Sequence, residues 1–122
     1  MALVLFLEHR KMGQKAKKCF EGAEEGKIEI IIPAMVIAEI GYLSQKNKIK
    51  ISIKDIEALT KRYPNYQIAD LNLPIIKESF FINDIPELHD RLIAGTAQHF
   101  NVKLITDDPI IIDSKAVDTI WK

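Results

Sequence analysis

One charge stands out in a long apolar stretch. Glu39 is the only charged residue between Ile30 and Leu43. If this stretch is helical after Pro33, Glu39 shares a face with Val36 and Leu43, which lie three residues before it and four after it. A carboxylate on a buried face is costly unless a cation, a hydrogen-bond donor or a metal compensates it. Glu39 is therefore a candidate functional residue.

Two further acids lie where α/β proteins place chemistry. Asp90 falls in the first turn of an expected helix, where the helix dipole favours an anion, and Asp108 follows an expected strand. Converging carboxylates repel one another, so a cluster of them is reasonable chiefly around a divalent cation. The donors are all oxygens, and the chain has one cysteine and no paired histidines. This combination indicates Mg²⁺ or Mn²⁺ rather than zinc.

Each of these acids also has a purely structural interpretation. Glu39 could pair with a buried arginine or lysine, Asp90 could cap its helix, and Asp108 could cap the turn at Pro109. His89, beside Asp90, is a candidate general base, although metal-dependent phosphodiesterases usually let the ion activate water. Two groups of lysines are candidates for a phosphate path or for solvated helix faces; they are Lys11, Lys15, Lys17 and Lys18, and Lys46, Lys48, Lys50 and Lys54.

The elements that must position these residues alternate between helix and strand patterns, which is typical of a parallel sheet covered by helices. Ser52 followed by Asp55 predicts a capped helix start. The expected helices span 14–25, 53–62, 72–81 and 88–100, and Pro33 opens a further one that should run to about Gln45. The expected strands span 28–32, 66–69, 102–105 and 117–121.

Length and composition set the class of protein. A chain of 122 residues suits one domain, and 17 basic residues balance 17 acidic ones, so any nucleic-acid contact must come from a local patch. The lone Cys19 excludes an internal disulfide and suits a reducing cytoplasm. The apolar run Ala2–Leu7 is too short for a signal peptide or a membrane span, so we expect a cytoplasmic location without membrane attachment.

Two segments carry a family resemblance. The run HDRLIAGTAQHFNVKLITDDPII, starting at His89, resembles the carboxyl-terminal half of PIN domains, and IPAMVIAEIGYL resembles the family helix that bears the second acid. PIN domains are small metal-dependent ribonucleases that include the toxins of VapBC toxin–antitoxin pairs. The resemblance implies an α/β three-layer α/β/α sandwich with a central parallel sheet, formed as a single PIN-like domain by residues 1–122.

The resemblance also implies roles for individual residues. Glu39, Asp90 and Asp108 match the family's second, third and fourth acids and would hold Mg²⁺ or Mn²⁺, with Thr106 in support. The implied activity is endoribonuclease cleavage of RNA by a VapC-like toxin. The implied partners are an RNA substrate, a cognate antitoxin and a second copy in a homodimer.

The family's first strand and first aspartate have no counterpart, because that strand would lie before Met1. One interpretation is that the chain begins at an internal methionine of a longer protein and is truncated at its N-terminus. In this interpretation ALVLFLEHRKMG resembles the first family helix. The other interpretation is that Ala2–Leu7 fills the strand's place and brings Glu8 near the missing ligand. The missing acid also leaves a second function open, a catalytically impaired module that binds RNA, an antitoxin or itself without cleaving.

Overall fold

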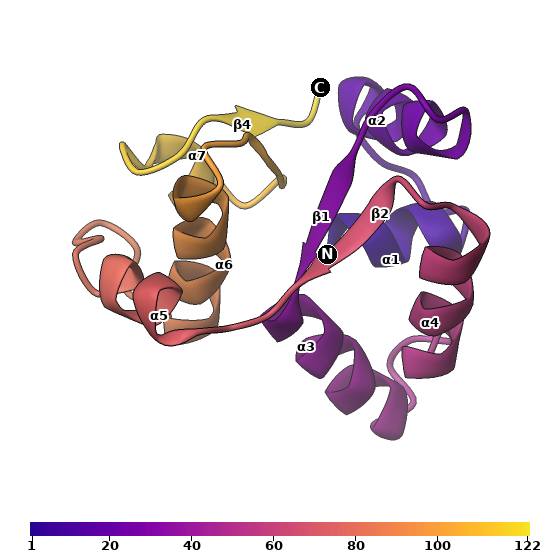
Figure 1. Ribbon diagram of the computed structural model, residues 1–122, viewed down its shortest axis with the longest axis horizontal. Coiled ribbons are helices and arrows are strands. Elements are labelled where there is room, and N and C mark those ends of the chain that lie inside the picture. The colour runs from indigo at the N-terminus through magenta and orange to yellow at the C-terminus, as the bar shows by residue number, and fades with distance from the viewer.

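The computed structural model describes residues 1–122 as helices alternating with short strands (Figure 1). The helices are α1 (Ala2–Leu7), α2 (Gln14–Glu24), α3 (Ala34–Gln45), α4 (Ile53–Arg62), α5 (Leu73–Ser79), α6 (Leu88–His99) and α7 (Pro109–Asp113). The strands are β1 (Ile30–Pro33), β2 (Tyr66–Ala69), β3 (Leu104–Ile105) and β4 (Thr119–Ile120). None of these helices is long and apolar enough to span a membrane.

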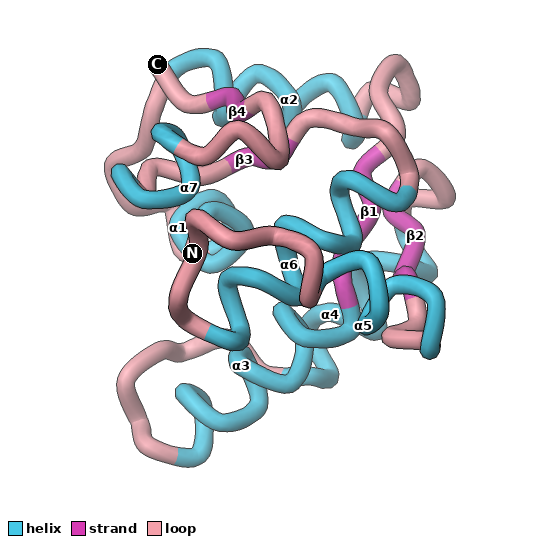
Figure 2. The backbone as a smooth tube through the Cα atoms, turned by 90° about the vertical axis from the view of Figure 1, so that its left-hand side faces the viewer, coloured by secondary structure: helices cyan, strands magenta, loops and turns pink.

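All strand pairing is parallel, which confirms the α/β class, and β1 pairs with β2 while β3 pairs with β4. In the first pair Ile30 lies opposite Tyr66, and in the second Leu104 lies opposite Thr119. The two pairs do not join into one sheet. Figure 2 shows them apart, with β1 and β2 on one side of the molecule and β3 and β4 on another.

The N-terminal run Ala2–Leu7 is helix α1, as the resemblance implies, so the alternative in which it fills the position of a strand is wrong. Leu3 and Val4 are buried in the main core, and the ring of Phe6 stacks on that of Phe20 in α2, with centroids 5.0 Å apart. A helix allows both contacts because residues three and four apart share a face. The apolar run therefore forms a short helix that packs into the core.

A five-residue helix, α7, was not expected. Pro109 occupies its first turn, where the missing N–H costs nothing, and Asp108 caps it. The strands around it are correspondingly shorter than predicted: β3 keeps two residues of 102–105, and β4 keeps two of 117–121.

Two hydrophobic clusters make up the core. The larger has twelve buried residues from α1 to α4 and their strands, including Phe20, Ile40 and Ile56. The smaller has four, Ile82, Ile85, Ala94 and Ile111, under the carboxyl-terminal half. One backbone hydrogen bond joins the end of the chain to α2: the amide of Ala16 donates to the carbonyl of Trp121 at 3.1 Å.

Candidate active site

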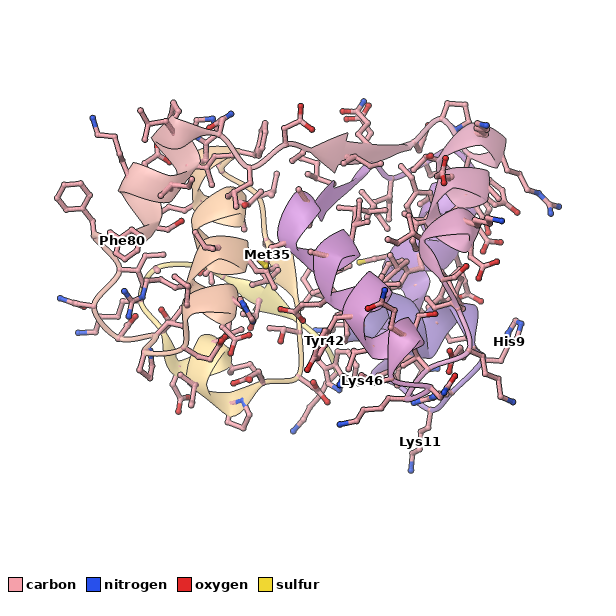
Figure 3. The ribbon with its side chains drawn as sticks, turned by 90° about the horizontal axis from the view of Figure 1, so that it is seen from below. His9, Lys11, Met35, Tyr42, Lys46 and Phe80 are labelled. Atoms are coloured by element: carbon pink, nitrogen blue, oxygen red, sulfur yellow. The ribbon has the colours of Figure 1, made fainter.

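Glu39 lies in the middle of α3, a helix that follows β1 directly. Met35 lies on the side of α3 toward α6, whereas Tyr42 and Lys46 lie together on its outer surface (Figure 3). Glu39 is half-buried, with 28% of its side chain exposed, and no arginine or lysine pairs with it. The alternative of a buried basic partner is therefore wrong. The imidazole of His89 lies nearby, with Nδ1 3.8 Å from Glu39 Oε1.

The electrostatics of Glu39 follow from its surroundings. Burial raises the pKa of its carboxyl above the usual range. His89 opposes this rise, while the nearby carboxylates of Asp90 and Glu87 add to it. The site thus holds negative charge that the protein itself compensates only in part.

Asp90 lies in the first turn of α6, as predicted, but it does not cap the helix. The cap is Glu87, whose Oε2 accepts a hydrogen bond from the amide of Asp90 at 2.7 Å. Burial raises the pKa of the Asp90 carboxyl, and the carboxylates of Glu87 and Asp108 raise it further. The Asp90 side chain is therefore left without a structural partner, in the company of other acids.

Asp108 and Thr106 follow β3 and form a compact turn. The amide of Asp108 donates to Thr106 Oγ1 at 3.1 Å. Asp108 Oδ1 in turn accepts from the amide of Ile110 at 2.8 Å, which confirms the interpretation of Asp108 as a cap. Because a carboxylate accepts through two oxygens, Oδ2 remains available.

One cavity of about 470 Å³ brings these residues together. Glu39, Asp90, Thr106 and Asp108 all line it, although they come from three separate parts of the chain. No three His, Cys, Asp or Glu side chains lie close enough together to hold a metal ion. The structure therefore places the four predicted residues at one cavity without gathering them into a ligand cluster.

Comparison with known proteins bears directly on this arrangement. The PIN domain family matches residues 2–116. The chain belongs to the PIN domain family. Its fold is similar to that of a chain in the crystal structure of VapBC2 from Rickettsia felis bound to a DNA fragment from their promoter, with a TM-score of 0.70 and 16% sequence identity. The alignment covers 99% of this chain and 93% of that one. No curated protein sequence matches the chain.

Glu8 does not belong to the site of this PIN domain, so the alternative that brings it near the missing ligand is wrong. Its carboxylate accepts from the amides of Lys50 and Ile51 at 2.6 and 3.0 Å, and Arg10 pairs with it at 2.5 Å. These contacts join the end of α1 to the loop between α3 and α4. The residues around Glu8 line a separate pocket, and none of them lines the acid-lined cavity.

One acid near the site of the PIN domain was not predicted. Glu87 Oε1 is 3.4 Å from His89 Nδ1, so the imidazole lies between two carboxylates, those of Glu39 and Glu87. The helix cap lowers the pKa of the Glu87 carboxyl, because the amide of Asp90 donates to it. Glutamate is not among the preferred helix caps, so residue type did not indicate this role. The only signal in the sequence was the position of Glu87, three residues before Asp90.

The donor set of the PIN domain fits a hard divalent cation in chemistry. The three predicted ligands are carboxylates, and no hydrogen bond holds the side chains of Glu39 or Asp90 in place. Burial raises the pKa of both carboxyls, and neighbouring carboxylates raise it further. A cation of the Mg²⁺ or Mn²⁺ class supplies a counter-charge through oxygen ligands.

Proposed function

We propose that this protein is a metal-dependent endoribonuclease of the VapC toxin type. The observation that supports it most is the meeting of Glu39, Asp90 and Asp108 at one cavity of a PIN domain. Separate elements supply the three acids. The carboxylate of Asp90 raises the pKa of Glu39, and that of Asp108 raises the pKa of Asp90. Such an arrangement lowers the stability of the folded protein. Ionisable groups with perturbed pKa values cluster at functional sites, and a metal site for phosphodiester cleavage is one such site.

In this proposal each residue has a defined task. Glu39, Asp90 and Asp108 would hold one or two Mg²⁺ or Mn²⁺ ions. Thr106 is a positioning residue, because its hydroxyl oxygen accepts a hydrogen bond from the amide of Asp108 and so fixes the turn. An ion held there would activate a water molecule and would neutralise charge on the scissile phosphate. Water adds to phosphorus, the bond to the leaving ribose oxygen breaks, and that oxygen takes up a proton.

The test is cleavage of single-stranded RNA with Mg²⁺ or Mn²⁺. We expect Glu39→Gln and Asp90→Asn each to lower the rate of cleavage by roughly 100-fold or more. Each substitution removes a negatively charged ligand that would hold the metal ion against the scissile phosphate. Glu29→Gln is the matched control, since Glu29 lines the same cavity but precedes β1 rather than following it. Equal losses in all three variants would contradict the proposed ligand set.

We further propose the partners that a VapC-type toxin has. The whole chain would act in the cytoplasm as a single domain and homodimer, silenced by a cognate antitoxin with a basic tail. The support is the fold similarity to a chain of VapBC2 and the acidic cavity, which a basic side chain would complement. An arginine-containing antitoxin peptide should inhibit cleavage of RNA in competition with Mn²⁺. Inhibition that is indifferent to Mn²⁺ would place the peptide elsewhere.

A second function is favoured by one observation, the absence of three acids within metal-binding distance of one another. In that alternative the protein is a non-catalytic module that binds RNA, an antitoxin or itself. The cleavage assay distinguishes the two. Binding of RNA with no cleavage at saturating Mn²⁺ would support the module and refute the nuclease.

A further inference from the structure

Positive charge is concentrated in two segments of an otherwise balanced chain, residues 9–20 and residues 40–54. Neither segment contains an aspartate or a glutamate, although the whole chain has 17 acids and 17 basic residues. The basic residues of the first are Arg10, Lys11, Lys15, Lys17 and Lys18, and those of the second are Lys46, Lys48, Lys50 and Lys54. If the fold brings the two segments together, a neutral protein gains a basic face.

Glu8 joins the two segments. Its carboxylate accepts hydrogen bonds from the amides of Lys50 and Ile51, and it pairs with Arg10. The loop after α1 is therefore held against the loop before α4, and Arg10 and Lys50 line the same pocket. Because only 6% of the Glu8 side chain is exposed, its carboxylate offers little negative charge to solvent.

The lysines of these two loops have no acidic partner. Lys11, Lys46, Lys48 and Lys50 are all exposed, and none of them forms an ion pair. Figure 3 shows Lys11 and Lys46 extending into solvent at the same lower edge of the view. We call these four lysines, with Arg10, the basic surface. Uncompensated charges of this kind attract a polyanion and release its counterions on binding.

Along α3, Tyr42 lies between the basic surface and the acids of the candidate active site. It follows Glu39 by three residues, so the two side chains are neighbours on the helix. Tyr42 is 61% exposed, and Lys46 Nζ lies 5.6 Å from the centroid of its ring. Lys46 is seven residues after Glu39, which is roughly 10 Å along the helix axis. The basic surface therefore begins about two helical turns from the acids.

An exposed aromatic ring beside unpaired cations is the combination by which proteins bind single-stranded nucleic acid, because bases stack on the ring while the cations contact phosphates. An acidic protein could use the lysines, but it would leave the ring of Tyr42 without a planar partner. A duplex keeps its bases stacked on one another. The combination therefore favours a single strand.

We propose that Tyr42 and the basic surface bind single-stranded RNA on one side of the bond that is cleaved. The ring of Tyr42 stacks on a base, and the lysines beyond it contact the phosphates that follow. This inference rests on the proposed function, which supplies RNA as the nucleic acid. Glu8 is a positioning residue here, since it holds the two loops together without touching the strand.

The test measures binding of a short labelled single-stranded RNA by fluorescence anisotropy, in EDTA and over a range of salt concentrations. The variant combines Lys11→Gln, Lys46→Gln and Lys48→Gln. We expect its affinity at low salt to fall by roughly tenfold or more. The slope of log K against log salt concentration should become shallower by about 2, because each phosphate contact to a single strand contributes about 0.7.

The matched control removes the same charge elsewhere. It combines Lys61→Gln, Lys77→Gln and Lys115→Gln, which change three exposed lysines outside the two basic segments. This variant should keep the salt dependence of the parent, because its lysines make no phosphate contacts in this proposal. Equal losses in the two triple variants would overturn the proposal, since they would mean that only net charge matters.

Tyr42 gives a second readout that is independent of charge. Tyr42→Ala should weaken binding of the single strand by roughly fivefold or more, with the salt slope unchanged, because base stacking is lost. Tyr42→Phe should bind like the parent. Double-stranded RNA should bind less tightly and should not respond to Tyr42→Ala.

These measurements separate the basic surface from the nuclease. Binding in EDTA needs neither metal nor cleavage, so a chain that binds as described but never cleaves would refute the nuclease and support the surface. A chain that cleaves RNA but shows no effect of the lysine variant would support the nuclease and overturn the surface. If the lysine variant weakened binding of RNA and of polyglutamate alike and Tyr42→Ala had no effect, the surface would suit an acidic protein, and the RNA proposal would fail.

Discussion

The carboxylates of Glu39 and Asp90 have raised pKa values, which makes their charge a cost to the folded state. A group with a raised acid pKa binds protons more readily when folded, so it lowers stability once the pH exceeds its ordinary value. A cation that binds the ionised pair should reverse this. Anything that binds only the folded state stabilises it, by about 2.7 kcal/mol at a concentration of 100 times Kd.

The first prediction therefore concerns metal-dependent melting. Saturating Mn²⁺ should raise the melting temperature by roughly 10 °C, given about 4 °C for each 1 kcal/mol in a domain of this size. Glu39→Gln and Asp90→Asn should melt higher than the parent in EDTA, and neither should respond to Mn²⁺. Glu29→Gln should respond like the parent. A parent chain indifferent to Mn²⁺ would remove the support for a cation site.

Glu8 has the opposite electrostatics. Hydrogen bonds from the amides of Ile51 and Lys50, together with Arg10, lower the pKa of its carboxyl against the opposing effect of desolvation. Only 6% of its side chain is exposed. A depressed acid pKa stabilises the folded state above the ordinary value of 4.5, and this contribution is lost as the pH falls through the lowered pKa.

The second prediction follows from that sign. Glu8→Gln should lower the free energy of unfolding at pH 7, and the difference from the parent should shrink as the pH falls below 4.5. Urea unfolding at several pH values measures it. Glu57→Gln, on the exposed face of α4, is the control and should have little effect at any pH. A Glu8→Gln deficit that is the same at pH 3 and pH 7 would show that packing, not charge, is lost.

At the scale of elements, α5 and α6 approach closely at one glycine. A Cβ atom on Gly95 would lie 1.8 Å from Ser79 Oγ and 3.0 Å from the Cα of the same residue. Ser79 is fully buried, and its hydroxyl donates to the carbonyl of Ile75. The contact involves backbone as well as side chain, so it cannot be relieved by a rotation alone.

Gly95→Ala should accordingly destabilise the protein by about 1–3 kcal/mol, the usual cost of overpacking. Gly41→Ala is the matched control in α3. Its new methyl group would meet only the end of the exposed Ile53 side chain, and alanine gains helix propensity of about 1 kcal/mol over glycine. Urea unfolding compares the two. Similar effects of both substitutions would refute the tight α5–α6 contact.

Elements governed by local signals were predictable from the sequence. The helix Ile53–Arg62 was predicted to the residue because Ser52 and Asp55 form the capping box there, with the amide of Ser52 donating to Asp55 Oδ2 at 2.7 Å. Strands depend on partners distant in sequence, which is why β3 and β4 are shorter than predicted. Helix α7 was missed because its isoleucine run has the composition of a buried strand.

The candidate site shows the same division. The positions of Asp90 and Asp108 on their elements follow from local pattern, and both were predicted. The fate of Glu8 depends on the loop at Lys50 and Ile51, more than forty residues away, which no local pattern encodes. The role of Glu87 depends on where His89 points.

At the scale of the whole molecule, the hydrophobic core is divided. The larger cluster belongs to α1–α4 with β1 and β2, and the smaller lies under the carboxyl-terminal half. Ile93 and Ile105 pack against the larger cluster and connect the two halves. Stability is rarely uniform in such an arrangement, because regions with fewer buried apolar contacts open at lower free energy.

The tie between Trp121 and α2 makes the protein its own optical probe. Trp121 is the only tryptophan, and it sits where the carboxyl-terminal half meets Gly13 and Ala16. Indole emission should therefore register separation of the two halves before any helix melts. In a urea titration we expect the fluorescence transition to precede the loss of helical circular dichroism. Superimposable transitions would mean that the halves unfold as one cooperative unit.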